Sequence, residues 1–140
     1  MKTTKETGPA HFPHGDVTRS ILVAFYAVYN ALGNGFLERV YVRALAEELR
    51  SRGLSVALEV PLEVRYHGVC VGTYRADCVV AGSVIVEVKA ASRLASEHEA
   101  QLLHYLRSSD IEVGLLLNFG VRPSFKRLAF SNQRKTPRRL

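Results

Sequence analysis

Residues 74–90 read YRADCVVAGSVIVEVKA, and this segment sets the architecture that the rest of the chain is expected to complete. Two runs, 69–80 and 84–90, are rich in β-branched residues. Their side-chain pattern has a period of two, which is typical of β-strands. Ala81-Gly82-Ser83 lies between them and suits a tight turn. The segment therefore predicts an antiparallel hairpin. Its even-numbered positions, Cys78 and four valines, form an apolar face that is fit to pack against helices.

Three charged residues lie inside these apolar strands. With a three-residue turn, Asp77 falls directly opposite Glu87, with Cβ atoms about 5 Å apart, and Lys89 points to the same face. Like charges in this position destabilise a hairpin unless a cation compensates them, and carboxylate oxygens suit Mg²⁺ or Mn²⁺. A lysine beside such a site can orient or deprotonate a water and stabilise charge on a phosphate. The hairpin thus predicts the groups needed for phosphodiester hydrolysis.

Two other interpretations of the hairpin stay open. In the first, the three charges lie on a solvated sheet face and Lys89 merely pairs with a carboxylate. In the second, a two-residue Ala81-Gly82 turn shifts the register, which places Asp77 opposite Val86 and turns Glu87 to the other face. Either interpretation would leave no site.

Helices are expected on both sides of these strands. An apolar pattern with helical spacing follows Asp16, the expected N-cap, and ends at Gly33-Asn34-Gly35. Further helices are expected at about 36–52 and 96–108, the latter with a capping box of Ser96 and Glu99. The remaining strands are expected at 55–60, 62–66, 113–119 and 125–130. This order predicts an α/β sandwich with a mixed sheet in one domain, 16–130, between a flexible leader, 1–15, and a basic tail, 131–140.

Polar residues on two of these helices extend the hypothesis. His98, Gln101 and Tyr105 follow one another at helical spacing on a helix that comes soon after Lys89. An amide and a phenolic hydroxyl on this face can bind a metal-bound water or a phosphate. In the alternative without a functional role, Tyr105 is a core residue and Gln101 faces solvent. Glu38 borders an apolar stripe, so it needs a metal or a basic partner if it is internal, the alternative being a rim salt bridge such as one with Arg75.

The segment GFLERVY, residues 35–41, resembles the motif after which the GxxExxY family is named. The similarity continues through four further segments: YRAD (74–77), VIVEVKA (84–90), HEAQLLHYL (98–106) and LLLNFG (115–120). That family is similar to the PD-(D/E)XK nuclease superfamily, whose members cut nucleic acids with magnesium. The resemblance implies a restriction-endonuclease-like sandwich, with a central mixed β-sheet flanked by helices.

The resemblance also implies a role for each matching residue. Asp77 and Glu87 correspond to metal ligands, Lys89 to the catalytic lysine, and Glu38 to the helix-borne acidic residue near the metal. Gln101 and Tyr105 resemble a Gln-x-x-x-Tyr element of recombination-associated branches, and His98 precedes them as a further substrate-binding candidate. The sequence departs from the pattern at one position, where alanine rather than proline precedes Asp77.

Charge and cysteine content limit the partners that we expect. The 140 residues carry a formal net charge of +6, all of which lies in residues 126–140. The basic residues of this segment include Lys126, Arg127, Arg134 and Lys135. We expect them either to bind nucleic acid, with DNA preferred to RNA, or to aid solubility. Two cysteines and the lack of a long apolar run predict a cytoplasmic protein without membrane association. A homodimer or a protein partner is expected to complete the surface that embraces a duplex.

Three functions follow as hypotheses. The first is a magnesium- or manganese-dependent nuclease. The second is a catalytically silent nucleic-acid-binding or regulatory module on the same fold, whose binding would be sensitive to salt and independent of metal. The third is a purely structural or protein-interaction role.

Overall fold

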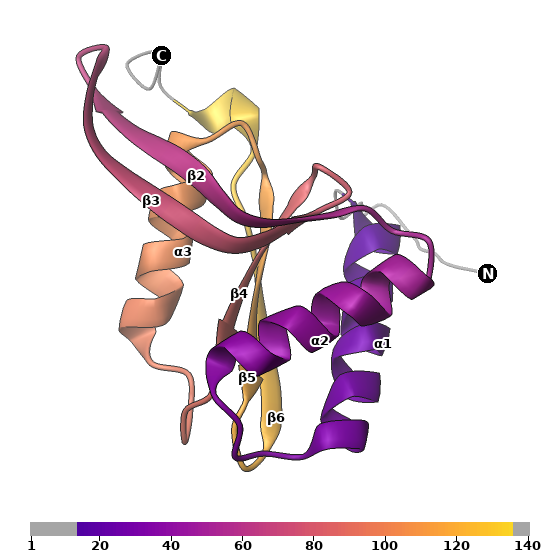
Figure 1. Ribbon diagram of the computed structural model, residues 1–140. Coiled ribbons are helices and arrows are strands. Elements are labelled where there is room, and N and C mark those ends of the chain that lie inside the picture. Colours follow the sequence, from indigo (N-terminus) through magenta and orange to yellow (C-terminus); the bar gives the residue numbers. More distant parts are fainter. Residues whose placement is uncertain (1–13, 136–140) are drawn as a thin grey trace.

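The computed structural model describes residues 14–135, which form a five-stranded mixed sheet with helices on both faces (Figure 1). The strand order across the sheet is β2-β3-β4-β5-β6, and every neighbouring pair is antiparallel except β4 and β5. The elements are α1 (Gly15–Leu32), α2 (Glu38–Ser51), β2 (Val56–Tyr66), β3 (Val69–Val80), β4 (Val84–Lys89), α3 (Ser96–Ser108), β5 (Val113–Phe119), β6 (Pro123–Ala129) and a short 3-10 turn, Asn132–Arg134.

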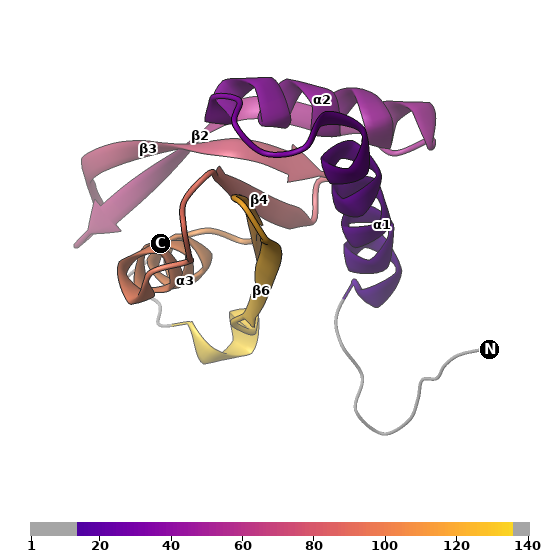
Figure 2. The ribbon, with the colours of Figure 1, turned by 90° about the horizontal axis from the view of Figure 1, so that it is seen from below.

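The helices divide between the two faces of the sheet. Helices α1 and α2 lie on one side and α3 lies on the other, as Figures 1 and 2 show. The larger core joins α1 and α2 to the even-numbered residues of the hairpin, and the smaller core joins α3 to Val79, Ile85 and Leu116. Because β5 is covered on both faces, all seven of its residues are buried. The expected α/β sandwich with a mixed sheet is confirmed.

Several boundaries differ from the sequence predictions for local reasons. Helix α1 begins at Gly15 with His14 as its N-cap, so Asp16 lies in the first turn and the predicted cap is wrong. The two strands expected at 55–60 and 62–66 are one strand, because β2 is an edge strand that continues through Pro61. An edge strand accepts proline when the missing N–H would have faced away from its neighbour. Strand β6 begins at Pro123, two residues before its predicted start.

The terminal segments are only partly described. The expected flexible leader, 1–15, lies outside the described residues except for its last two positions, and residues 136–140 of the basic tail also lie outside them. The described part of the tail contains the 3-10 turn. Between residues 14 and 135, no helix combines the length and apolar character needed to cross a membrane.

Strands β2 and β3 change direction together at Glu59 and Asp77. Their ladder pairs Leu58 with Cys78 and Val60 with Ala76, but skips the pair between them, where Glu59 has a positive φ of 50°. In β2, the even-numbered residues before Glu59 pack with α1 and α2, whereas the even-numbered residues after Glu59 pack with α3. The distal half of the β2–β3 hairpin therefore leaves the plane of the sheet and extends over α3 (Figure 1). Asp77 lies at this bend.

Candidate active site

The register of the central hairpin follows from its three-residue turn. Val80 pairs with Val84, and Cys78 pairs with Val86, so the next position along the two strands brings Asp77 opposite Glu87. The turn residues Ala81 and Gly82 both have positive φ, and Ser83 N–H donates to the Val80 carbonyl at 3.0 Å. The alternative two-residue turn is wrong. Asp77 and Glu87 thus meet across the strands.

At this point, hydrogen bonds from backbone N–H groups to the two carboxylates replace the backbone-to-backbone hydrogen bonds of the strand ladder. Val88 N–H donates to Asp77 Oδ2 at 2.7 Å, and Asp77 N–H donates to Glu87 Oε2 at 2.9 Å. Each carboxylate is therefore fixed by the backbone of the opposite strand, and Glu87 is only 8% exposed. Within the described residues, the second oxygen of each carboxylate accepts no protein hydrogen bond. Two preorganised oxygen atoms are left for a ligand.

The protein compensates the charge of this pair only in part. Burial, and after it the negative charge of Asp77, raise the pKa of Glu87 to about 7 against the opposing hydrogen bonds from Asp77 N–H and Tyr74. Burial also raises the pKa of Asp77, whereas the Val88 N–H and the charge of Lys89 act to lower it. The nearby charges of Glu38 and Glu59 raise the pKa of Asp77 again. A bound cation would relieve this repulsion.

The structure places Lys89 and Glu38 beside the pair. Lys89 is the half-buried last residue of β4, and among the described residues it forms no ion pair, although its charge acts on Asp77. The Glu38 carboxylate accepts the N–H of Ala90, the residue after Lys89, at 3.3 Å. The alternative rim salt bridge to Arg75 does not form, because the Arg75 guanidinium donates to the Glu59 carbonyl at 3.2 Å.

Gly35 and Tyr41 explain how Glu38 reaches this position. Gly35 has a φ of 113°, which a residue with a Cβ rarely adopts, and it allows the chain to turn from α1 into α2. The buried Tyr41 hydroxyl donates to the Gly33 carbonyl at 2.6 Å and accepts the Phe36 N–H at 3.2 Å. Its ring stacks on Phe119 with centroids 4.4 Å apart. The glycine, glutamate and tyrosine of residues 35–41 thus act together to place one carboxylate beside β4.

Tyr74 is a site residue that the sequence analysis missed. Its hydroxyl donates to Glu87 Oε2 at 2.8 Å, and its ring stacks on Tyr105 of α3 at an angle of 17°. Gln101 acts to lower the pKa of the Tyr105 hydroxyl, so the predicted residues Gln101 and Tyr105 are linked to the carboxylates through Tyr74. In a regular strand Tyr74 and Asp77 would face opposite sides, and only the bend in β3 brings both to Glu87. Glu59, whose charge acts on Asp77, was missed for the same reason.

His98 has a local structural role. Its Nδ1 accepts the N–H of Ala95 at 3.1 Å, which caps the first turn of α3. Ala95 is the N-cap of this helix and its side chain cannot accept a hydrogen bond, so the predicted capping box of Ser96 and Glu99 is wrong. The predicted contact of His98 with substrate stays untested.

The basic residues near the C-terminus lie apart from the carboxylates. Lys126 and Arg127 are in β6, at the opposite edge of the sheet from β2. The Lys135 ammonium donates to the carbonyls of Ser109 and Ile111, at 2.7 and 3.0 Å, and Arg134 lies over the Phe130 ring. These described residues of the tail therefore help to pack the C-terminal segment against the domain.

The donor set at the carboxylate pair fits a magnesium or manganese ion. Asp77 and Glu87 offer hard oxygen ligands with uncompensated charge, and Glu38 lies nearby. Among residues 14–135 no group of three or more His, Cys, Asp and Glu side chains is arranged to enclose a metal ion. This agrees with Mg²⁺, which usually keeps several waters and binds through one or two carboxylates together with substrate phosphate.

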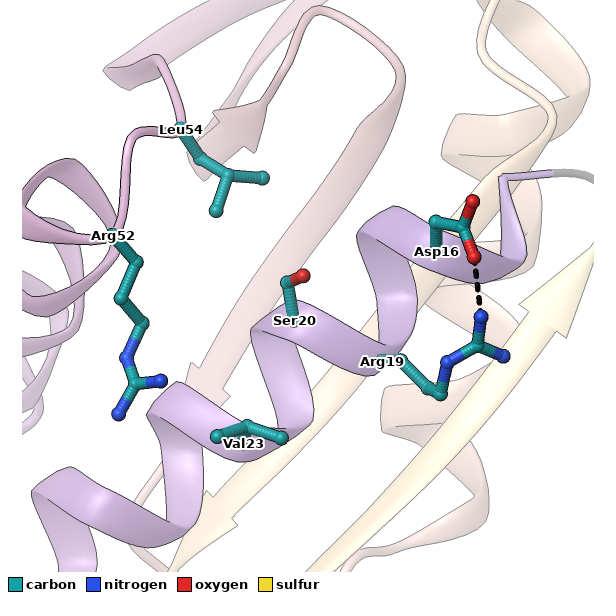
Figure 3. A pocket seen from close by; sticks show the side chains of 6 residues that line it. All are labelled: Asp16, Arg19, Ser20, Val23, Arg52 and Leu54. Carbon is teal, nitrogen blue, oxygen red and sulfur yellow. Dashed lines mark hydrogen bonds and ion pairs between the residues drawn. The ribbon is translucent and has the colours of Figure 1, made fainter. Parts of the chain in front are cut away.

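A hollow between α1 and the segment after α2 is separate from this site (Figure 3). Arg19 and Arg52 line it, but Arg19 pairs with Asp16 in its own helix, and Arg52 donates to Glu48 at 2.7 Å. Because both guanidinium groups are already paired, the hollow does not present converging donors to an anion.

Comparisons with known proteins agree with the observed architecture. A family model described as the PD-(D/E)XK nuclease superfamily matches residues 15–128. A solved structure, "Crystal structure of SSO0001", is similar with a TM-score of 0.50 and 20% sequence identity, over 84% of this chain and 59% of that chain. This similarity shows the fold, and the chain spans less than two thirds of the length of that protein. No curated protein matches the sequence.

Proposed function

This chain belongs to the PD-(D/E)XK nuclease superfamily, and we propose that it is a magnesium- or manganese-dependent nuclease that hydrolyses phosphodiester bonds, with DNA as the preferred substrate. We assign the domain to residues 16–130 and place it with the GxxExxY proteins on the pattern of residues 35–41. The observation that carries the proposal is the meeting of Asp77 and Glu87 across the hairpin, with Lys89 beside them. Within residues 14–135, each carboxylate keeps one oxygen free of protein hydrogen bonds.

Each residue would contribute a distinct part of the chemistry. Asp77 and Glu87 would hold the cation, which when bound polarises the phosphoryl oxygen and lowers the pKa of water. The Lys89 ammonium, which forms no ion pair with any residue from 14 to 135, is available to orient the attacking water and to stabilise negative charge on the phosphate. Gln101 and Tyr105 are the candidates for contact with a phosphate oxygen. Tyr74 holds the Glu87 carboxylate in a fixed orientation through its hydroxyl.

A catalytically silent nucleic-acid-binding module is the second candidate. It is favoured by alanine in place of proline before Asp77. Such a module would bind nucleic acid without added metal, and Glu87→Gln would leave that binding unchanged. It would cleave none of the substrates offered.

A cleavage screen separates these candidates. Single-stranded, duplex and branched DNA, together with RNA, would be incubated with Mg²⁺ or Mn²⁺, with EDTA as the metal-free control. We expect cleavage that EDTA abolishes and that Lys89→Ala reduces by about a hundredfold or more. Arg19→Ala, which removes an exposed basic side chain on α1, away from the carboxylate pair, is the matched control and should retain activity. Full activity of Lys89→Ala would exclude the mechanism.

A further inference from the structure

Two hollows adjoin the candidate active site, and their chemistry indicates what kind of nucleic acid fits. The first, the α3 hollow, is lined by Val64 of β2 and by Gln101, His104, Tyr105, Arg107 and Ser108 of α3. The second, the loop hollow, is lined by three segments: 34–36 between α1 and α2, 90–92 after β4, and 119–121 after β5. The loop hollow lies at the end of the molecule where the parallel strands β4 and β5 terminate, the lower end in Figure 1.

Both hollows connect directly to the candidate active site. Tyr105 lines the α3 hollow and stacks on Tyr74, which donates to Glu87. Ala90 lines the loop hollow, follows Lys89 in the chain, and donates its N–H to Glu38. The carboxylate pair is therefore linked to the α3 hollow through Tyr74 and Tyr105, and Lys89 adjoins the loop hollow through Ala90.

The α3 hollow carries groups that bind phosphate. Arg107 and His104 are exposed on successive turns of one helix face, and no carboxylate lines the hollow with them. The Arg107 guanidinium lies 5.2 Å from the centroid of the Phe130 ring and, among the described residues, forms no ion pair. The ring restricts the guanidinium while its N–H groups stay available to an anion.

The loop hollow is suited to the face of a base. Phe36 is 47% exposed there, and its ring packs against Tyr41 with centroids 6.0 Å apart and an angle of 79°. The adjoining backbone is close-packed, because a Cβ on Gly120 would lie 2.0 Å from the Ala91 carbonyl oxygen. An exposed aromatic ring beside a floor of small residues is a stacking platform. A base can stack on it only when its own face is uncovered, as in a single strand.

We propose that the substrate strand is single-stranded nucleic acid, with a base stacked on Phe36 in the loop hollow and a phosphate held by Arg107 in the α3 hollow. This inference rests on the proposed function, since it places the scissile phosphate between the two hollows. Each contact should leave its own signature. Stacking on Phe36 contributes affinity that is nearly independent of salt, whereas the Arg107–phosphate contact contributes affinity that falls as salt rises.

The test measures binding in a Lys89→Ala background, so that a labelled oligothymidylate and a matched duplex stay intact. We expect Phe36→Ala and Arg107→Ala each to weaken single-strand binding about tenfold, and Arg107→Ala alone to reduce the slope of log affinity against log salt by about one. Phe36→Leu, which keeps apolar volume without the ring, should behave as Phe36→Ala does. Phe125→Ala and Arg19→Ala are matched controls outside both hollows and should bind normally.

Unchanged single-strand affinity in the Phe36 and Arg107 variants would overturn the proposed path. An equal loss of duplex binding in these variants would overturn the assignment to a single strand. Because binding is measured without cleavage, the result is separable from the proposed function, which fails instead if the wild-type chain cleaves no substrate with Mg²⁺ or Mn²⁺.

Discussion

Tyr74 joins two parts of the site that the chain supplies from different elements. Its hydroxyl donates to Glu87 of β4, and its ring stacks on Tyr105 of α3. Burial raises the pKa of this hydroxyl, and the charge of Glu87 raises it further, so Tyr74 stays protonated and remains a donor. Glu87 needs that donor because it is almost completely buried beside another carboxylate. Tyr74 is thus a positioning residue for Glu87.

Tyr74→Phe tests this role. The change removes one hydrogen bond to a buried carboxylate and keeps the ring that stacks on Tyr105. We expect the free energy of unfolding to fall by about 2 kcal/mol, measured by urea denaturation. Tyr66→Phe, an exposed tyrosine near the tip of the same hairpin, is the control and should change stability little. A Tyr74→Phe protein as stable as the wild type would show that the hydroxyl does not support Glu87.

Glu87 also predicts how the stability of the metal-free protein depends on pH. The folded state raises the pKa of Glu87 from 4.5 to about 7, so it holds the proton more tightly than the unfolded chain does. The associated stability is fully present below about pH 4.5 and is lost as the pH rises through about 7. The expected loss is about 3 kcal/mol.

The measurement compares urea denaturation of wild-type and Glu87→Gln proteins from pH 4.5 to 8 in EDTA, so that the contributions of groups that do not interact with Glu87 cancel. The difference in unfolding free energy should change across this interval, and Mg²⁺ should restore wild-type stability at neutral pH. A constant difference would mean that Glu87 titrates normally in the folded state.

Among the elements, the loop after β4 depends on a close contact with the end of β5. The buried Asn118 side chain donates to the Ala91 carbonyl at 3.0 Å and accepts the Ala91 N–H at 2.9 Å. Gly120 lies so close to Ala91 that a Cβ there would be 2.0 Å from the carbonyl oxygen. These contacts fix the backbone immediately after Lys89, and therefore the position of Lys89 itself.

Gly120→Ala should consequently destabilise the protein. The added methyl group would collide with backbone, which cannot move aside as a flexible side chain can. We expect a loss of about 3 kcal/mol in unfolding free energy. Gly72→Ala in β3, where an added Cβ meets no atom within 4 Å, is the matched control and should change stability by less than about 0.5 kcal/mol. Equal stability of the two variants would contradict the close approach at Gly120.

The sequence predicted those elements whose pattern is local. The three-residue turn set the register of the hairpin, and alternation set its apolar face, so the meeting of Asp77 and Glu87 was accessible from residues 74–90. The bend at Glu59 could not be predicted from the sequence, because it depends on a positive φ in a residue that is not glycine and on the packing of α3. Tyr74 could not be assigned to the site without that bend.

At the scale of the whole molecule, the basic C-terminal segment lies apart from the candidate active site. Residues 126–140 carry the formal net charge of +6, but the described part of this segment lies along β6 and the end of α3. The carboxylate pair lies on β3 and β4, and both the α3 hollow and the loop hollow adjoin the site. Substrate binding at the site is therefore expected to depend on Arg107 and Phe36. A partner subunit and a role for the tail in binding DNA stay predictions.

The binding of a divalent cation to the carboxylate pair tests the central claim most directly. Isothermal titration with Mn²⁺ would compare the wild type, Glu87→Gln and Glu63→Gln, the last removing an exposed glutamate that pairs with Arg65 on β2. We expect binding to the wild type and to Glu63→Gln, and its loss in Glu87→Gln. If Mn²⁺ binds the wild type and Glu87→Gln with equal affinity, or binds neither, the carboxylate pair is not a metal site.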